Sequence, residues 1–268
     1  MNRLILLTVF LFAAVSCNSD DSPAANAVKP VPAFFNIDGD ELYATFDGFP
    51  GFILNAVKSN PDSFLVLMHQ ILSFDRDTYV IVDKEHFLSS AYEPDDLVSL
   101  NNYPLSRNRN DLRLRSVVMP DLMAMDTASD NIGLRLVYSS SYRSFAYQES
   151  VYNRHVNQMG QEAADRVSAR PGSSQHQLGT TVDFGSITDE FADTPEGKWL
   201  LDHGWEFGFS LSYPDGYEEV TGYRHEIWHY RWIGRPAAAE CHYFFNDIQH
   251  YFLSYLDKNW DFFYSRLK

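Results

Sequence analysis

Apolar and polar positions follow two different periods along this chain, and the periods predict a mixture of helices and strands. Helical spacing of apolar side chains predicts helices over residues 64–74, 119–131, 145–158, 161–167 and 196–206. Runs rich in β-branched and aromatic residues predict strands over 78–82, 134–140, 180–185 and 226–233. From residue 236 onward, aromatic and aliphatic residues at helical spacing predict one or two helices that cover the sheet. This mixed order favours an α+β fold, with a small central antiparallel sheet flanked by helices and an N-terminal helical extension.

The first 17 residues have the pattern of an export signal. One Arg precedes an apolar run from Leu4 to Val15, and small residues lead to Cys17. Because the run is short for a membrane span, we expect cleavage rather than a permanent membrane helix. Residues 14–17 are similar to a lipobox, which predicts acylation of Cys17, although Ala14 stands where Leu is usual. A plain signal peptide is the alternative.

The same patterns divide the chain into four segments. Residues 1–17 form the signal peptide with its lipobox, and residues 18–33 are small, polar and proline-bearing, as expected of a flexible tether. Residues 34–77 form a helical extension of unknown role, and residues 78–268 form the domain that carries the chemistry, C-terminal helices included. If Cys17 is acylated, Cys241 is the only remaining thiol, so an intrachain disulfide is excluded.

Composition and charge restrict the possible partners. The chain has 268 residues, of which 45% are apolar, and this is enough for a good hydrophobic core. Its formal net charge of -15 argues against nucleic-acid binding, because contacts to phosphates need clustered Lys and Arg. We expect a monomer that does not bind nucleic acid.

Two stretches carry candidate chemistry. His176 and Asp183 are separated by Gly179, which lets the chain turn back, so both side chains can face one point. Glu226 lies three residues before His229. Two His and one carboxylate with an open fourth position are typical of a catalytic zinc site, and Glu226 would then serve as the general base.

This interpretation has alternatives at the level of residue pattern. The spacing alone is a weak signal, so scattered polar residues without a metal are one alternative, and the same ligands also accept other divalent ions. His225 is a possible rival to His229 as a ligand. On an extended strand Glu226 and His229 face opposite sides, so they meet only at a local bend or twist.

Over residues 79–256 the chain resembles the VanY-type D-alanyl-D-alanine carboxypeptidase family of zinc peptidases, which shares its fold with the hedgehog signalling domain. The matching stretches are residues 82–98, 139–156, 164–185 and 204–234. The family signature S-x-H-x6-D falls on Ser174, His176 and Asp183, and the signature E-x-W-H ends on His229. The resemblance implies that His176, Asp183 and His229 bind Zn²⁺ and that Glu226 is the catalytic base.

The resemblance also implies substrate contacts. The family's Y-R-S motif falls on Tyr142, Arg143 and Ser144, and the Arg is expected to contact the substrate carbonyl or carboxylate. A fixed guanidinium there would share the negative charge that develops on the scissile oxygen. Gln148 and Ser174 match positions implied to bind substrate, although each could instead only orient its neighbours.

Three positions depart from the family pattern. Ser141 stands where Gly is common before Tyr-Arg, Ile227 replaces a usual Pro, and Ser212 occupies a position where Arg often precedes Tyr-Pro. None of them removes an implied zinc ligand or the base. The departures concern the shape of the substrate pocket, and with it the choice of peptide.

These observations predict a membrane-anchored lipoprotein that faces the periplasm or cell-wall space and releases terminal D-alanine from peptidoglycan stem peptides. The bond, D,D or L,D, stays open. The alternatives are a peptidoglycan endopeptidase, a non-catalytic zinc-stabilised lipoprotein that binds the cell wall, and a protein whose active part is the helical extension. The last has no chemical motif to support it.

Overall fold

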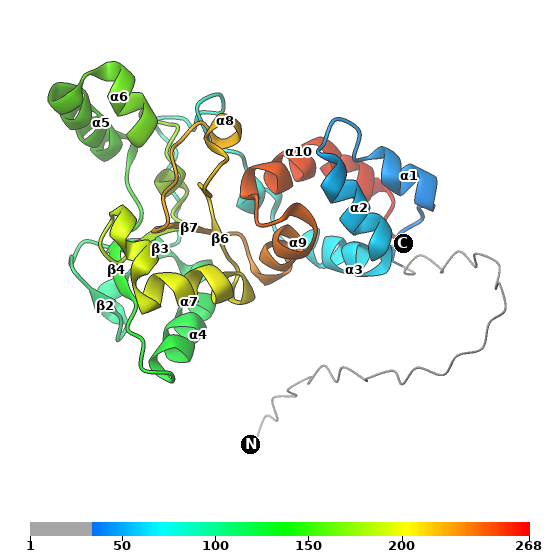
Figure 1. Ribbon diagram of the computed structural model, residues 1–268, viewed down its shortest axis with the longest axis horizontal. Coiled ribbons are helices and arrows are strands. Elements are labelled where there is room, and N and C mark those ends of the chain that lie inside the picture. Colours follow the sequence, from blue (N-terminus) through cyan, green and yellow to red (C-terminus); the bar gives the residue numbers. More distant parts are fainter. Residues whose placement is uncertain (1–33) are drawn as a thin grey trace. The chain divides into compact units, whose positions relative to one another are not determined.

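The computed structural model describes residues 34–268 (Figure 1). The signal peptide, the lipobox with Cys17 and the tether that the sequence predicts over residues 1–33 lie outside these residues. Within residues 34–268, none of the helices combines the length and the apolar character that a membrane crossing requires.

Five short strands form the central sheet, in the order β2-β4-β5-β7-β6. They are β2 (Ser106–Arg107), β4 (Val137–Ser140), β5 (Thr181–Phe184), β6 (Phe209–Leu211) and β7 (His229–Trp232). The pairs β4-β5, β5-β7 and β6-β7 are antiparallel, whereas β2 runs parallel to β4 at the edge. A separate antiparallel pair consists of β1 (Leu97–Ser99) and β3 (Arg113–Arg115). The expected small antiparallel sheet is confirmed, with one parallel edge strand added.

Two helices lie on one side of this sheet, α4 (Met119–Asp130) and α7 (Pro195–His203) (Figure 1). Their buried side chains join those of the strands in one hydrophobic cluster, in which Leu122 and Leu200 pack with Phe184 and Tyr230. The remaining helices near the sheet are α5 (Phe145–Met159), α6 (Gln161–Val167) and α8 (Glu218–Thr221). Helices predicted from apolar spacing over 119–131, 145–158 and 161–167 are therefore present.

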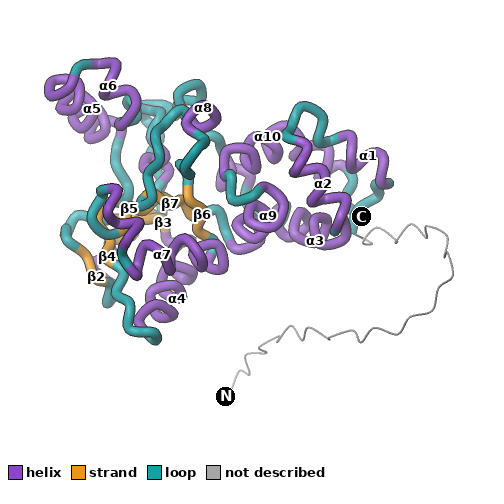
Figure 2. Tube along the Cα trace, viewed as in Figure 1, coloured by secondary structure: helices purple, strands orange, loops and turns teal. Residues whose placement is uncertain are grey.

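A second hydrophobic cluster is built entirely from helices and their connections, and Figure 2 shows these helices gathered together. They are α1 (Gly39–Ala44), α2 (Gly51–Ser59), α3 (Pro61–Ile71), α9 (Arg235–Phe245) and α10 (Gln249–Ser265). Phe64 of α3, for example, stacks edge-on against Phe244 of α9 with ring centroids 5.3 Å apart. The N-terminal helical extension is thus confirmed, but the C-terminal helices share its core instead of simply covering the sheet.

Residues 78–82 do not form the strand that their β-branched and aromatic side chains predict. A 3₁₀ helix occupies Arg76–Tyr79, and residues 80–82 have no regular structure. The physical reason is a buried guanidinium: Nη2 of Arg231 donates to the carbonyl oxygens of Thr78 and Val80, both at 2.9 Å. A side chain therefore takes the carbonyl groups that a neighbouring strand would otherwise use.

Five further 3₁₀ helices connect these elements, and one of them carries a site residue. They are Leu100–Asn102, Ser116–Val118, Gln175–Leu178, Asp189–Asp193 and Gly204–Phe207. The 3₁₀ helix Gln175–Leu178 leads directly into β5 and contains His176. All four of its residues are buried, which fixes the position of the imidazole.

Candidate metal centre and active site

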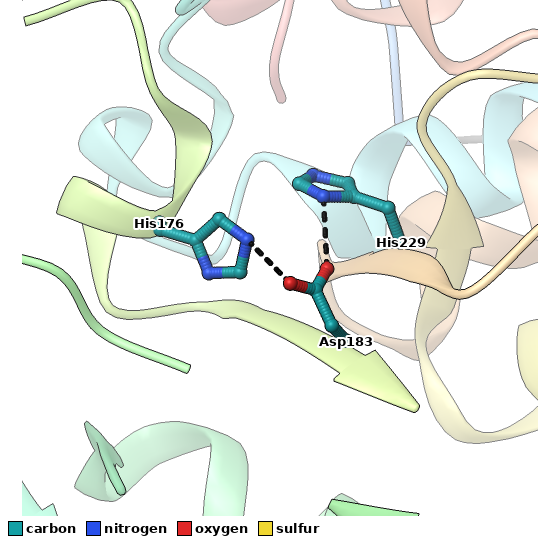
Figure 3. Close-up of side chains that lie close together, drawn as sticks. All are labelled: His176, Asp183 and His229. Atoms are coloured by element: carbon teal, nitrogen blue, oxygen red, sulfur yellow. Dashed lines mark ion pairs between the residues drawn. The ribbon is translucent and has the colours of Figure 1, made fainter. Parts of the chain in front are cut away.

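His176, Asp183 and His229 come together at the centre of the sheet (Figure 3). Asp183 lies on β5 and His229 begins β7, and the two residues are directly paired in the antiparallel register. One ligand atom from each of the three side chains lies within 4.8 Å of the others, and all three residues are buried. Oδ2 of Asp183 lies 3.2 Å from Nε2 of His176, and its Oδ1 lies 3.1 Å from Nδ1 of His229.

Gly179 makes the turn that brings His176 back toward Asp183. It ends the 3₁₀ helix with a φ of 71°, in the left-handed region that favours glycine. A Cβ atom at this position would lie 2.9 Å from a methyl carbon of Leu97 and 3.0 Å from Cγ of Arg115. The turn that the sequence predicts between the two candidate ligands therefore depends on this glycine.

A hydrogen-bonded turn places Glu226 beside His229. The backbone N–H of His229 donates to the carbonyl of Glu226 at 3.1 Å, and β7 begins only at His229. Oε2 of Glu226 then lies 3.7 Å from Nδ1 of His229. The bend that an extended strand would lack is present, and His225 points elsewhere, with its Nδ1 3.0 Å from the carbonyl oxygen of Tyr213.

Outer hydrogen bonds fix which imidazole nitrogens face Asp183. Nδ1 of His176 lies 2.7 Å from the carbonyl oxygen of Ser141, and Nε2 of His229 lies 3.2 Å from Oε1 of Gln175. Both oxygens only accept, so these nitrogens carry the protons in the neutral rings. Nε2 of His176 and Nδ1 of His229 therefore present lone pairs to the carboxylate, which is the arrangement of metal-binding histidines.

This arrangement fits a cation. Burial lowers the pKa of His176 to about 4, and the charge of Arg143 acts in the same direction, so at neutral pH this ring is uncharged. Nε2 of His176 and Oδ1 of Asp183 are buried without a hydrogen-bond partner within residues 34–268. Two nitrogens and a carboxylate oxygen suit Zn²⁺.

Two further groups complete the charge pattern around these ligands. Burial raises the pKa of Glu226 to about 8, and the negative charge of Asp183 adds to the effect. Nη2 of Arg143 lies 3.9 Å from Oδ2 of Asp183, while its Nη1 donates to Oε1 of Gln148 at 2.9 Å. Gln148 in turn donates to the carbonyl of Ala169 at 2.6 Å. A carboxyl group able to exchange a proton near neutral pH and a positioned guanidinium therefore flank the three ligands.

The site opens into a cavity of about 480 Å³. His176, Asp183, His229, Glu226, Arg143, Gln148 and Ser174 all line it. Tyr142 and Ser144 line an adjoining cavity of about 270 Å³. Arg143 lines both cavities. The hydroxyl of Ser144 accepts from the backbone N–H of Tyr147 at 3.2 Å and so caps α5. Of the candidate substrate residues, these two lie beside the metal cavity and not in it.

Sequence reasoning missed several residues of the site. Gln175 accepts both from His229 and from the hydroxyl of Ser212, the latter at 2.7 Å, and its only sequence signal is that it adjoins His176. The ring of Tyr213 lies 4.7 Å from that of His229. His155, for which the sequence offers no companion carboxylate, lines the cavity from α5. Tyr213 and His155 both lie inside stretches that resemble the family, and Tyr213 begins its Tyr-Pro pattern, but neither position has an implied role there.

Comparisons with known proteins agree with this geometry. Residues 111–235 match the family model VanY, described as D-alanyl-D-alanine carboxypeptidase, and they include every candidate ligand and the candidate base. YodJ of Bacillus subtilis (strain 168) is 32% identical over 165 residues, which are 59% of this chain and 60% of YodJ. The alignment thus spans less than two thirds of that relative.

Two solved structures have a similar fold. The LdcB LD-carboxypeptidase matches with a TM-score of 0.60 and 28% identity, over 68% of this chain and 87% of that one. The vancomycin resistance D,D-pentapeptidase VanY, solved in complex with Zn(II), matches with a TM-score of 0.55 and 26% identity, over 66% and 99% of the two chains. Sequence signatures, site geometry and fold agree over this part of the chain, and we conclude that residues 111–235 form a domain of the VanY-type D-alanyl-D-alanine carboxypeptidase family.

Proposed function

We propose that this protein is an exported zinc-dependent carboxypeptidase that releases terminal D-alanine from peptidoglycan stem peptides. The observation that carries the proposal is the position of Glu226: a buried carboxyl group, with its pKa raised to about 8, lies beside a His-Asp-His set in an open cavity. A carboxyl group is not needed there to hold a metal, since the three ligands already suffice. The export signal predicted over residues 1–17 supports this, because peptidoglycan lies outside the cytoplasmic membrane.

His176, Asp183 and His229 would hold the Zn²⁺ ion. When bound, the ion supplies a Lewis acid that polarises the scissile carbonyl and increases the acidity of a water molecule. Support comes from the donor set, from the outer hydrogen bonds to Ser141 and Gln175, and from the related VanY structure with Zn(II). The outer bonds orient both rings before a metal arrives, which lowers the cost of assembling the site.

Glu226 would move the proton. Its carboxylate accepts a proton from the attacking water and then donates it to the amine of the departing D-alanine. A base of this kind works best when its pKa lies near the working pH, and burial provides that condition for Glu226. Its Oε2 is held 3.7 Å from the ring of His229 by the turn that both residues share, so the base keeps a fixed position relative to the ligands.

Arg143 would stabilise the charge that develops during attack. The guanidinium faces the cavity, and Gln148 anchors one of its nitrogens, so it requires little reorganisation when negative charge appears on the scissile oxygen. Such a fixed donor lowers the barrier by about 3 kcal/mol. The charge pattern supports this role, because no other arginine lies beside the three ligands among the described residues.

Substrate class rests on the relatives, which include both an LD-carboxypeptidase and a D,D-pentapeptidase. We therefore keep two candidate bonds, D-Ala-D-Ala in a pentapeptide and the L,D bond in a tetrapeptide. Both reactions release one D-alanine, whereas the alternative endopeptidase would release a longer fragment. Product mass separates all three outcomes in one assay.

The test uses purified protein with defined penta- and tetrapeptide stems, with zinc or with chelator, and follows the products by mass spectrometry. Zinc-dependent release of D-alanine is expected. Glu226→Gln should retain zinc and lose turnover by about a thousandfold, because only proton transfer is removed. His176→Ala should lose both zinc and turnover, and Glu219→Gln, which changes an exposed carboxylate of α8 outside the cavity, should match the unmodified protein. Normal turnover by Glu226→Gln would contradict the base assignment.

A further inference from the structure

Helix α5 is unusual because it contributes almost nothing to a hydrophobic core. Of its 15 residues only Gln148 is buried. Its apolar side includes Tyr147, Val151 and Met159, which all line the cavity of the metal centre together with His155. These positions recur every four residues and therefore share one face of the helix. Figure 1 shows α5 and α6 standing away from the strands of the sheet. The residues on this face of α5 line one wall of the cavity.

The charges on the cavity wall are mostly compensated, with one exception. Nε of Arg109 donates to Asp111 at 2.9 Å, and Nη1 of Arg224 lies 2.8 Å from Asp189. Arg154, on the cavity face of α5, has no ion pair to any residue between 34 and 268. In a chain with a net charge of -15, an unpaired cation that faces a binding cavity is a recognition element for an anion.

The position of Arg154 along the helix indicates which part of a peptide it would meet. Ser144 caps the N-terminus of α5 next to Arg143, and Arg154 lies ten residues further on, roughly 15 Å along the helix axis. An extended peptide covers about 3.3 Å per residue, so this distance corresponds to about four residues. The group that leaves in the proposed reaction is one residue long and does not reach that far. Arg154 must therefore face the acyl part of the substrate.

We propose that Arg154 pairs with a carboxylate that lies within about four residues before the scissile bond, and thereby determines which stem peptides bind. This inference rests on the proposed function. A stem peptide offers two carboxylates in that range, the side-chain carboxylate of diaminopimelate at its third residue and the α-carboxylate of γ-linked D-Glu at its second. When lysine replaces diaminopimelate at the third residue, the side-chain carboxylate is lost and an ammonium group remains. When D-Glu is amidated at the second residue, its negative charge is lost.

The test compares four matched peptides, with diaminopimelate or Lys at the third residue and D-Glu or D-isoglutamine at the second. Arg154→Gln should lower kcat/KM about fivefold for the two peptides that carry the recognised carboxylate, mainly through KM, and leave the two peptides without it unchanged. Arg154→Lys should restore most of the preference, and Arg154→Glu should reverse it. The pair of peptides that responds identifies which carboxylate Arg154 meets.

Lys198→Gln is the matched control, because it removes an exposed positive charge of α7 that lines neither cavity. It should leave all four kcat/KM values unchanged. If Arg154→Gln lowers kcat/KM equally for all four peptides, or lowers it for none, the inference about Arg154 is wrong. Release of D-alanine by the same protein would still support the proposed function. If no peptide is hydrolysed, the proposed function fails, and binding of the four peptides to Glu226→Gln protein, measured by calorimetry, tests Arg154 separately.

Discussion

Glu226 and Glu240 are both buried carboxyl groups, but their surroundings differ. Glu226 has Arg143 and His229 nearby and lines the cavity, and burial raises its pKa to about 8. Glu240 lies on α9 with neither carboxyl oxygen hydrogen-bonded to any described residue, and burial alone raises its pKa well above the usual value. The first group has a proposed catalytic role, whereas the second makes the stability of the fold depend on pH.

The pH dependence of unfolding follows from Glu240. Above the ordinary glutamate pKa of about 4.3 the unfolded chain releases this proton while the folded chain keeps it, so stability falls as pH rises. Each pH unit costs at most about 1.4 kcal/mol until the raised pKa of the folded state is passed. Glu240→Gln should remove the contribution of Glu240 to this dependence, and its advantage over the unmodified protein in urea unfolding should grow from pH 5 to pH 7. Parallel pH profiles of the two proteins would contradict the prediction.

At the residue scale, sequence signatures are informative where chemistry restricts the residue type. His176, Asp183 and His229 could be named as candidates because few side chains bind a divalent cation, and the structure brings all three together. Gln175 could not be named as a site residue, because its role depends on a hydrogen bond between its amide oxygen and the ring of His229, 54 positions later in the sequence. The carbonyl of Ser141 is a backbone group and has no sequence signal at all.

At the scale of elements, strands β5 and β7 position two of the three proposed ligands. Their antiparallel register places Asp183 opposite His229, and the turn before β7 adds Glu226. The next pair of that ladder, Val182 with Tyr230, faces the core under the site. Arg231 then links this sheet to the segment that precedes β1, through its bonds to Thr78 and Val80.

Arg231→Met tests that link. The substitution keeps the approximate length of the side chain but leaves the carbonyl groups of Thr78 and Val80 without their donor. We expect a loss of about 2 kcal/mol in the free energy of unfolding, measured by urea denaturation. Arg135→Met is the control, since within residues 34–268 the side chain of this exposed arginine is hydrogen-bonded only to the hydroxyl of Ser106, and the substitution should cost less than about 0.5 kcal/mol. Equal losses in both variants would contradict the assigned role.

Helices were easier to predict than strands in this chain. The spacing of apolar residues, with Pro120 near the start of α4 and Gly160 between α5 and α6, identified these three helices, each of which has at least seven residues. The strands have only two to four residues, too few for an alternating pattern, and β1, β2, β3 and β6 were missed for this reason. Residues 78–82 misled the prediction because their propensity is overridden by a tertiary contact.

At the scale of the whole described chain, the two ends build one hydrophobic cluster. Phe35 forms a bridge with Leu267, and the N–H of Asn36 donates to the carbonyl of Arg266 at 2.8 Å. Between them, α1, α2 and α3 pack on α9 and α10. The sequence contained no signal for this association, because hydrophobic spacing shows that a helix has an apolar face but not which partner covers it.

A chain that begins at residue 78 tests whether the later segment folds alone, as the sequence-based division of the chain predicts. The structure leads us to expect that it does not fold alone. Without α1, α2 and α3, helices α9 and α10 would expose apolar side chains such as Phe244, which Phe64 now covers. Each uncovered large apolar side chain costs about 2 kcal/mol, and several of them exceed the stability of a typical domain. Thermal unfolding followed by circular dichroism should lose its cooperative transition. A chain that begins at residue 34 should melt cooperatively, and equal melting of both would support a boundary at residue 78.

The near absence of buried residues in α5 has a consequence for how this protein diversifies. Substitutions on a helix that carries no core cost little folding energy, so the wall of the cavity is free to vary from one lineage to another. Asp183 and His229, fixed in paired strands at the centre of the sheet, have no such freedom. If the proposed function holds, selection for a different peptide substrate would therefore act on α5 while the proposed zinc ligands stay constant.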